Sequence, residues 1–270
     1  MNQENNKNHN DQWWSEDYGF FGDFYIEGDN SDEGYLINKK QGLEERTKEE
    51  VDGIIKLLSL KNNSKVLDCP CGYGRHSIEL ARRGIIVTGS DINSIHLGKA
   101  EEEAERQGLK VNFVKENMLK LKYNSEFDAV INMFYSFGFF ETDEENKEVL
   151  KNFYNALAPG GKFLMHTDVN VPTITSGQYK QDEERTLRNG NVLRIIDKYD
   201  PKTKRINGTW IIKNQSGEEE KKDYSVRVYT KEEFIDLCYK IGFKECCTYS
   251  DWSGEEYTAS SEDMIIVATK

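Results

Sequence analysis

Residues 66–75 read VLDCPCGYGR: an apolar pair that ends a predicted buried strand, two spaced glycines, and the start of a helical pattern. Gly72 and Gly74 lack a Cβ, so the backbone can turn sharply there and approach a ligand closely. The free N–H groups at the start of a helix favour an anionic group. The segment therefore predicts a strand, a tight turn and a helix that together bind a carboxylate or a phosphate.

A second signal follows about 20 residues further along the chain, the spacing typical of a ribose-binding acid. Residues 85–91, IIVTGSD, predict a strand that ends in Asp91, from which a carboxylate can bind both hydroxyls of a ribose. A dinucleotide site would have a third glycine in G-x-G-x-x-G, whereas the turn here reads Pro70-x-Gly72-x-Gly74. Pyrophosphate binding is therefore disfavoured, and Asp91 is the expected ribose ligand.

From Thr47 to Lys270 the chain resembles the class I S-adenosylmethionine-dependent methyltransferases, whose first motif ends a strand with an acid and continues through spaced glycines. Residues 127–133 (FDAVINM) resemble the fourth strand of that family, and residues 158–162 (APGGK) resemble its turn into the fifth. The resemblance implies an α/β fold with a Rossmann-like seven-stranded sheet, mostly parallel with the last strand antiparallel, and helices on both faces. It also implies S-adenosyl-L-methionine as cofactor and S-adenosyl-L-homocysteine as product.

The resemblance further implies which residues bind the cofactor. Asn117 stands where many relatives carry an acid that accepts a hydrogen bond from the adenine amine, and an amide oxygen can accept the same bond more weakly. Arg46 would pair with the methionine carboxylate, unless it is a surface arginine at a helix end. The expected cofactor-binding residues are Tyr25, Arg46, Asp68, Pro70, Cys71, Gly72, Asp91, Ile92, Asn117, Met118 and Met133.

Composition narrows the function. The chain has 270 residues, 37% of them hydrophobic, which is enough for one sizeable core. A net charge of -12 without a basic stripe argues against a nucleic-acid partner. Five cysteines without a C-x-x-C pair indicate reduced thiols and no metal site. No apolar run approaches the roughly 20 residues that span a bilayer, and the start has no signal-peptide region, so we expect a cytoplasmic protein without membrane contact.

Three regions are expected. Residues 1–46 combine a polar, disordered tail with an aromatic and acidic segment that either packs on the domain or forms a lid. Tyr18 and Phe21 of this segment are candidate substrate contacts. Residues 47–170 and 230–270 form the methyltransferase core, and residues 171–229 form a β insert. Within the core, capping boxes predict helix starts at three pairs, Thr47 with Glu50, Thr142 with Glu145, and Thr230 with Glu233.

The catalytic opening is expected after the fourth strand, at residues 132–140, NMFYSFGFF. Enzymes that methylate nucleobases or glutamine amides usually have (Asp/Asn/Ser)-Pro-Pro-(Tyr/Phe) there; this segment instead resembles amino-sugar and glycine N-methyltransferases. Its aromatic rings either bind the sulfonium charge or belong to the core. His166, with an unperturbed pKa of ~6.5, is the candidate base unless it is structural, and Tyr135 or an acid of the N-terminal segment is the alternative. Asp168 and Asn170 follow at the same sheet edge as candidate substrate contacts.

The insert contains three β-like runs, at residues 192–196, 205–212 and 224–229, which predict an antiparallel meander. If the meander covers the substrate, Arg194, Trp210 and Arg227 are candidate pocket residues; a sheet that forms a homodimer is the alternative.

The sequence as a whole predicts methyl transfer to an amine or a hydroxyl of a small molecule. A methyltransferase acting on a peptide or protein amine and a non-catalytic cofactor-binding protein are the alternatives. The identity of the acceptor, O- against N-methylation, and the oligomeric state stay open.

Overall fold

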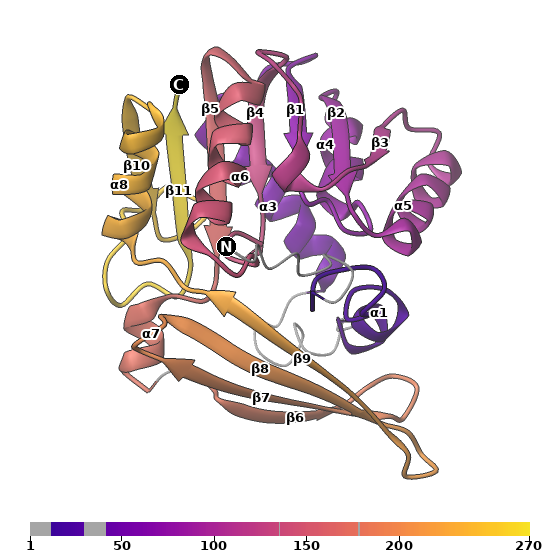
Figure 1. Ribbon diagram of the computed structural model, residues 1–270. Coiled ribbons are helices and arrows are strands. Elements are labelled where there is room, and N and C mark those ends of the chain that lie inside the picture. The colour runs from indigo at the N-terminus through magenta and orange to yellow at the C-terminus, as the bar shows by residue number, and fades with distance from the viewer. Residues whose placement is uncertain (1–11, 30–41, 135, 178) are drawn as a thin grey trace, which may run out of the picture.

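The computed structural model describes residues 12–29, 42–134, 136–177 and 179–270. Its centre is a seven-stranded sheet in the order β10-β11-β5-β4-β1-β2-β3 (Figure 1). The strands are β1 (Lys65–Asp68), β2 (Ile86–Asp91), β3 (Asn112–Lys115), β4 (Phe127–Asn132), β5 (Leu157–Thr167), β10 (Glu245–Tyr249) and β11 (Met264–Thr269). Neighbours from β5 to β3 run parallel, whereas β11 is antiparallel to both β5 and β10. The predicted Rossmann-like sheet with its antiparallel last strand is confirmed.

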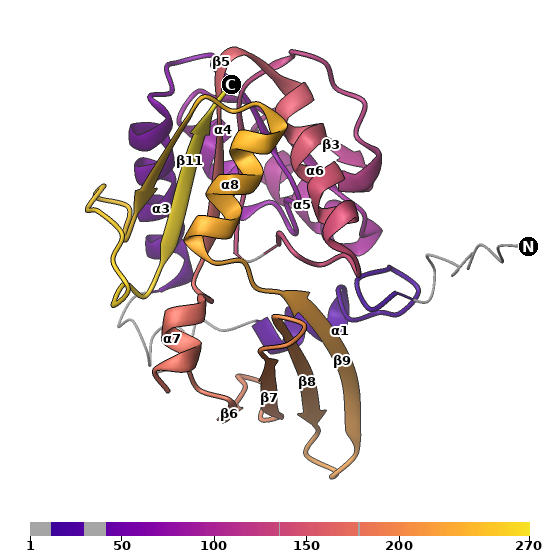
Figure 2. The ribbon, with the colours of Figure 1, turned by 60° about the vertical axis from the view of Figure 1, so that its left-hand side comes forward.

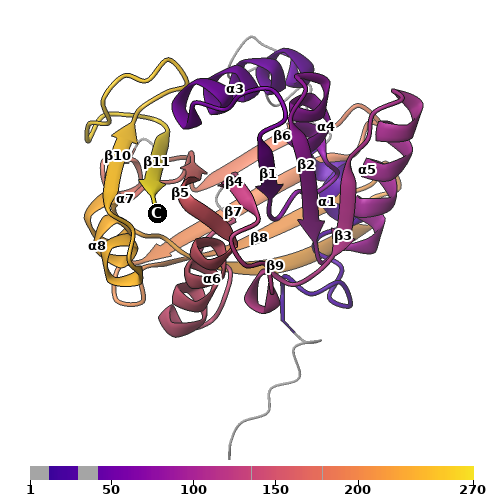
Figure 3. The same cartoon turned by 90° about the horizontal axis from the view of Figure 1, so that it is seen from above.

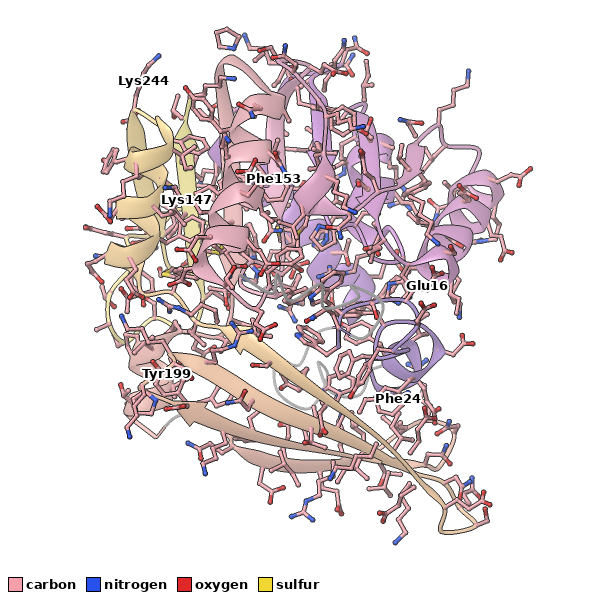
Figure 4. All side chains as sticks on the ribbon, in the orientation of Figure 1. Glu16, Phe24, Lys147, Phe153, Tyr199 and Lys244 are labelled. Atoms are coloured by element: carbon pink, nitrogen blue, oxygen red, sulfur yellow. The ribbon has the colours of Figure 1, made fainter. Side chains whose placement is uncertain are left out.

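Helices cover both faces of this sheet (Figure 3). One face carries α3 (Leu43–Leu58) and α4 (Arg75–Arg82), and the other carries α6 (Asp143–Ala156) and α8 (Lys231–Ile241). The helix α5 (Ser94–Arg106) lies against β2 and β3, and a short helix η2 (Met118–Lys120) follows β3. Apolar side chains at helical spacing make the contact, for example Phe153 of α6, which stacks on Phe163 of β5 at 5.4 Å between ring centroids (Figure 4).

Two of the three predicted capping boxes are confirmed and one is wrong. Thr142 caps α6 and Thr230 caps α8, each with the reciprocal glutamate bond. Thr47, however, lies inside α3, which begins four residues earlier at Leu43, and its Oγ1 donates a hydrogen bond to the Leu43 carbonyl at 2.7 Å. Glu50 does not act as a capping residue either, because its carboxylate binds basic side chains from two helices.

The insert is a second sheet below the first (Figures 1 and 2). After the short helix α7 (Val171–Thr175), it orders four antiparallel strands as β6-β7-β8-β9. These strands are β6 (Asp182–Thr186), β7 (Val192–Asp200), β8 (Arg205–Lys213) and β9 (Glu219–Arg227). The sequence predicts only three of them, because β6 reads DEERT and shows no apolar alternation. It is an edge strand, paired on one side only, where charged side chains are tolerated.

The described part of the aromatic N-terminal segment, residues 12–29, lies between the two sheets (Figures 1 and 2). It consists of turns followed by α1 (Asp23–Asp29). Trp14 meets Phe140 of the core at 5.1 Å, while Phe20 meets Trp210 of the insert at 5.4 Å. Phe24 extends from α1 toward the insert sheet (Figure 4), where it forms an apolar cluster with Phe20, Leu193 and Ile212. The segment therefore joins the core to the insert through buried rings.

Residues 1–11 and 30–41, which hold most of the predicted tail and part of the aromatic and acidic segment, lie outside the described residues. None of the helices in the described ranges combines the length and the apolar character needed to cross a bilayer.

Candidate functional site

A cavity of about 360 Å³ lies at the carboxyl edge of the central sheet, between the core, residues 12–29 and the insert. The core contributes residues 69–73, the end of β2 and the residues that follow β3. After β4 it contributes Met133, Phe134, Ser136, Phe139 and Phe140. Rings from the N-terminal segment and from β8 and β9 close the other sides. A ligand at this sheet edge would thus touch all three parts of the chain.

The glycine turn forms one wall of the cavity, and its two glycines have different roles. Both are in the left-handed region, with φ of +54° at Gly72 and +80° at Gly74. A Cβ on Gly72 would meet no atom within 4 Å, because the space above it is open, and this residue lines the cavity. A Cβ on Gly74 would lie 2.7 Å from Ala100 and 3.1 Å from Phe113. Gly72 therefore admits a ligand, and Gly74 permits close packing.

Asp91 ends β2 and lines the cavity, as its position in the sequence predicts. Its Oδ2 accepts the Gly72 N–H at 2.8 Å, and its Oδ1 accepts the Asn93 N–H at 2.9 Å. Burial raises the pKa of this carboxyl, while the backbone donors work in the opposite direction. Each oxygen keeps a second lone pair, so the carboxylate is held in one orientation and can accept further hydrogen bonds.

Asp68 lies beneath the turn and is not among the cavity-lining residues, although Pro70 and Cys71 are. Ser77 Oγ donates to its Oδ2 at 2.6 Å, and its Oδ1 has no hydrogen-bond partner among the described residues. Burial raises its pKa to about 7. Asp68 is thus a buried carboxyl that supports the turn from below.

Ile92, Glu116, Asn117 and Met118 form the wall next to Asp91. Asn117 Oδ1 already accepts the Leu119 N–H at 2.9 Å and so caps η2, which leaves one lone pair for a ligand. Glu116 was not predicted from the sequence. It lines the cavity beside Asn117, and partial burial raises its pKa. The sequence signal that could have identified Glu116 as a cavity residue is its position directly before Asn117.

Of the two arginines near the opposite wall, Arg75 lines the cavity and Arg46 does not. Arg46 Nε donates to the fully buried Glu50 at 2.7 Å, and the Arg75 guanidinium and His76 bind the same carboxylate. Both guanidinium groups lie over the Phe134 ring, Arg46 at 4.6 Å and Arg75 at 4.5 Å from its centroid. The sequence assigned the carboxylate-binding role to Arg46, whereas the structure brings Arg75 to the cavity.

This ionic cluster has strongly shifted acid–base properties. Burial alone would raise the pKa of Glu50, but the charges of Arg75 and Arg46 and the hydrogen bond with His76 hold it well below its usual range. Burial, reinforced by the Arg75 charge, lowers the pKa of His76 to about 4. The cluster is therefore anionic at Glu50 and neutral at His76 near pH 7, and it holds Arg75 at the cavity.

The candidate base His166 is fully buried at the end of β5 and is not among the cavity-lining residues. Its ring lies between Phe134, at 4.8 Å, and Trp252, at 5.1 Å between centroids. Neither ring nitrogen has a hydrogen-bond partner among the described residues, and Nε2 is 3.7 Å from Asp263 Oδ1. The alternative base, Tyr135, lies outside the described residues. Proton acceptance by His166 would thus need a path from the cavity.

The seven candidate substrate residues divide into two groups. Phe21, Asp168 and Trp210 line the cavity. The other four are Tyr18, Asn170, Arg194 and Arg227, which have structural partners elsewhere. The Tyr18 hydroxyl accepts a hydrogen bond from the Asp223 N–H, and Asn170 caps α7 and binds two backbone carbonyls. Arg194 pairs with Asp182 on the exposed face of the insert. Arg227 is buried, and its guanidinium pairs with Glu233 and Asp143.

The part of the cavity that faces the insert is aromatic. Trp13 and Phe21 contact Phe139 at centroid distances of 4.8 Å and 5.6 Å, and Tyr224 lies 5.9 Å from Trp13. Trp210 also lines the cavity. Asp168, an exposed acidic residue after β5, also lines the cavity. Among the lining residues in the described ranges, Arg75 is the only arginine or lysine, and it is held by Glu50.

Comparisons with known proteins agree with this geometry. A family model described as a methyltransferase domain matches residues 66–161. A putative methyltransferase of Geobacillus sp. (strain WCH70) is 26% identical over 211 residues, covering 76% of this chain and 84% of the relative. A glycine/sarcosine N-methyltransferase of Aphanothece halophytica is 27% identical over 250 residues, covering 91% of this chain and 89% of the relative. An S-adenosylmethionine-bound amino pentose methyltransferase from Micromonospora echinaspora shares the fold, with a TM-score of 0.65 at 18% identity over 88% of this chain and 95% of that one.

The sheet order and the matched domain define the class of protein: the chain belongs to the class I S-adenosylmethionine-dependent methyltransferases. It is an enzyme, and S-adenosyl-L-methionine is its cofactor. The cavity fits such a group, because the open space above Gly72 lies next to the fixed carboxylate of Asp91.

Proposed function

We propose that the enzyme methylates an amine of a small molecule. The observation that carries this proposal is the composition of the cavity lining, which in the described ranges combines many aromatic rings with the acidic residue Asp168 and includes no lysine. A cavity lined by aromatic rings and an acidic residue favours a cationic or amine-bearing ligand, since both a carboxylate charge and the ring faces attract an ammonium group. The cavity volume of about 360 Å³ lies in the range of small-molecule sites and favours a small acceptor over a peptide.

The relatives support the same class of acceptor. One is named as a glycine/sarcosine N-methyltransferase and one structural neighbour as an amino pentose methyltransferase, and both names specify a small molecule with an amine or an amino sugar. The likeness covers 91% of this chain for the first protein and 88% for the second.

The cofactor, when bound, supplies an activated methyl group on a sulfonium. The residues proposed to hold it are Asp91 at the ribose, Ile92 and Met118 at the adenine, and Arg75 at the carboxylate. Asp168 would attract the ammonium form of the acceptor and accept the proton that the nitrogen must lose to become nucleophilic. The surrounding rings would exclude water, and alignment alone is worth up to roughly 7 to 11 kcal/mol.

The proposal is tested by incubating the purified protein with the cofactor and pairs of matched acceptors. Glycine against glycolate, and an amino sugar against its parent sugar, differ in the amine alone. We expect mass spectrometry of the acceptors to show methylation of the amines only. Asp168→Asn should lower kcat/KM for the amine at least tenfold, while Asp236→Asn, on the exposed face of α8, serves as the matched control. Methylation of the hydroxyl partners, or of peptides alone, would contradict the proposal.

A further inference from the structure

His96 is a cavity residue that neither the sequence motifs nor the proposed reaction uses. It lies in the first turn of α5, five residues after Asp91, and its side chain is among those lining the cavity. Only 2% of the residue is exposed, yet its Nε2 has no hydrogen-bond partner among the described residues. A buried polar atom without a partner is uncommon in folded proteins and calls for a specific explanation.

The surroundings of His96 hold the ring in place. Its backbone N–H donates to Asn93 Oδ1 at 3.0 Å, which fixes the start of α5. The rings of Phe21, Tyr25 and Tyr73 lie around the imidazole at centroid distances of 6.2, 6.0 and 6.1 Å. Two of these rings come from the N-terminal segment, and the same turn of α5 binds that segment directly, since Asn93 Nδ2 donates to the Phe21 carbonyl at 2.9 Å.

The charge state of His96 restricts what Nε2 can bind. Burial lowers the pKa of His96, and Lys99 adds to this effect. Asp91, Asp23 and the Gly22 backbone act in the opposite direction without reversing it. The imidazole is therefore neutral near pH 7, with one N–H and one lone pair. A hydroxyl both donates and accepts, so it can bind Nε2 in either tautomer, whereas an ammonium or a carboxylate matches only one.

We propose that His96 is a cofactor-binding residue whose Nε2 forms a hydrogen bond with a ribose hydroxyl, next to the carboxylate of Asp91. The proposal rests on Asp91 as the ribose ligand and extends the ribose site onto α5. Since Asn93 of the same turn holds the Phe21 carbonyl, the residue that contacts the ribose also belongs to the turn that anchors the N-terminal segment over the cavity.

The test is calorimetric titration of S-adenosylhomocysteine and of its 2′-deoxy and 3′-deoxy analogues into the wild type and His96→Phe. A neutral hydrogen bond corresponds to about a 3- to 10-fold change in affinity. We expect His96→Phe to weaken S-adenosylhomocysteine binding by that factor, but to bind one deoxy analogue as well as the wild type does. Ile95→Ala, at a half-exposed position of the same turn, is the matched control. Equal losses for all three ligands, or no loss, would overturn the proposal.

A second measurement does not depend on a variant. The ¹⁵N shift of His96 Nε2 in the wild-type protein should change on adding S-adenosylhomocysteine and should not change with the analogue that lacks the contacting hydroxyl. Identical responses to all three ligands would also overturn the proposal. Binding of S-adenosylhomocysteine that Asp91→Ala abolishes would leave the ribose assignment intact, so failure at His96 is distinguishable from failure of the site.

Discussion

Alanine at each glycine of the turn after β1 should separate ligand binding from folding. Both residues have positive φ, so Gly72→Ala and Gly74→Ala each carry backbone strain of roughly 1 to 2 kcal/mol. At Gly74 the new methyl group would also lie 2.7 Å from the Ala100 Cβ and 3.1 Å from Phe113 Cζ. Such overpacking adds about 1 to 3 kcal/mol, because neither neighbour can move without displacing α5 or β3.

At Gly72 no atom lies within 4 Å of the added methyl group, which would instead occupy space that the cofactor needs. We therefore expect Gly74→Ala to lower the free energy of unfolding by about 2 to 5 kcal/mol, and Gly72→Ala by about 1 to 2 kcal/mol. Binding of S-adenosylhomocysteine should weaken more than tenfold in Gly72→Ala. Urea denaturation gives the first quantity and calorimetry the second. Equal destabilisation by the two variants, or wild-type binding in Gly72→Ala, would refute this reasoning.

Three further predictions concern buried polar groups and the insert. Glu50→Gln leaves basic side chains without their buried anion and should lower the free energy of unfolding by about 3 to 5 kcal/mol, measured by urea denaturation. Between pH 4 and 6.5, the depressed pKa of His76 (about 4) makes stability fall on acidification, whereas the raised pKa of Asp68 (about 7) makes it rise. Asp68→Asn should remove the second effect, so its unfolding free energy should fall more steeply than the wild type's, by about 1 kcal/mol per pH unit; parallel pH curves would contradict this. Gly208→Ala places a methyl group 2.2 Å from Asp197 Oδ1 and should distort the insert, raising KM for the amine acceptor while calorimetric binding of S-adenosylhomocysteine stays within about twofold.

Local patterns in the sequence predicted single elements of the core, and the family resemblance that these patterns carry predicted the seven-stranded sheet. The glycine turn after β1, the acid that ends β2, and the helices capped by Thr142 and Thr230 are each defined by residues within a few positions of one another. Turn chemistry, capping and hydrophobic period act over that range, so they can be read without knowing the fold. The edge to which Asp91 is delivered follows from the parallel order of the strands.

The boundaries that local patterns missed depend on partners distant in the chain. A capping box was predicted at Thr47, but α3 begins at Leu43, and the expected capping partner Glu50 instead binds Arg75 and His76 of another helix. The polar strand β6 forms because its backbone pairs with β7. Its own residues show no apolar alternation that would predict a strand.

The composition of the cavity wall was likewise decided only by the tertiary structure. Asp168 and Arg75 reach the cavity, whereas His166 and Arg46, which the sequence favoured, are enclosed by side chains from other elements. Trp210 lines the cavity because its strand, β8, packs against Phe20 of the N-terminal segment, which is far from Trp210 in the sequence. A residue's type and its place on a strand are local properties of the chain. Whether its side chain faces a ligand or the core depends on what packs against it, and those contacts exist only after folding.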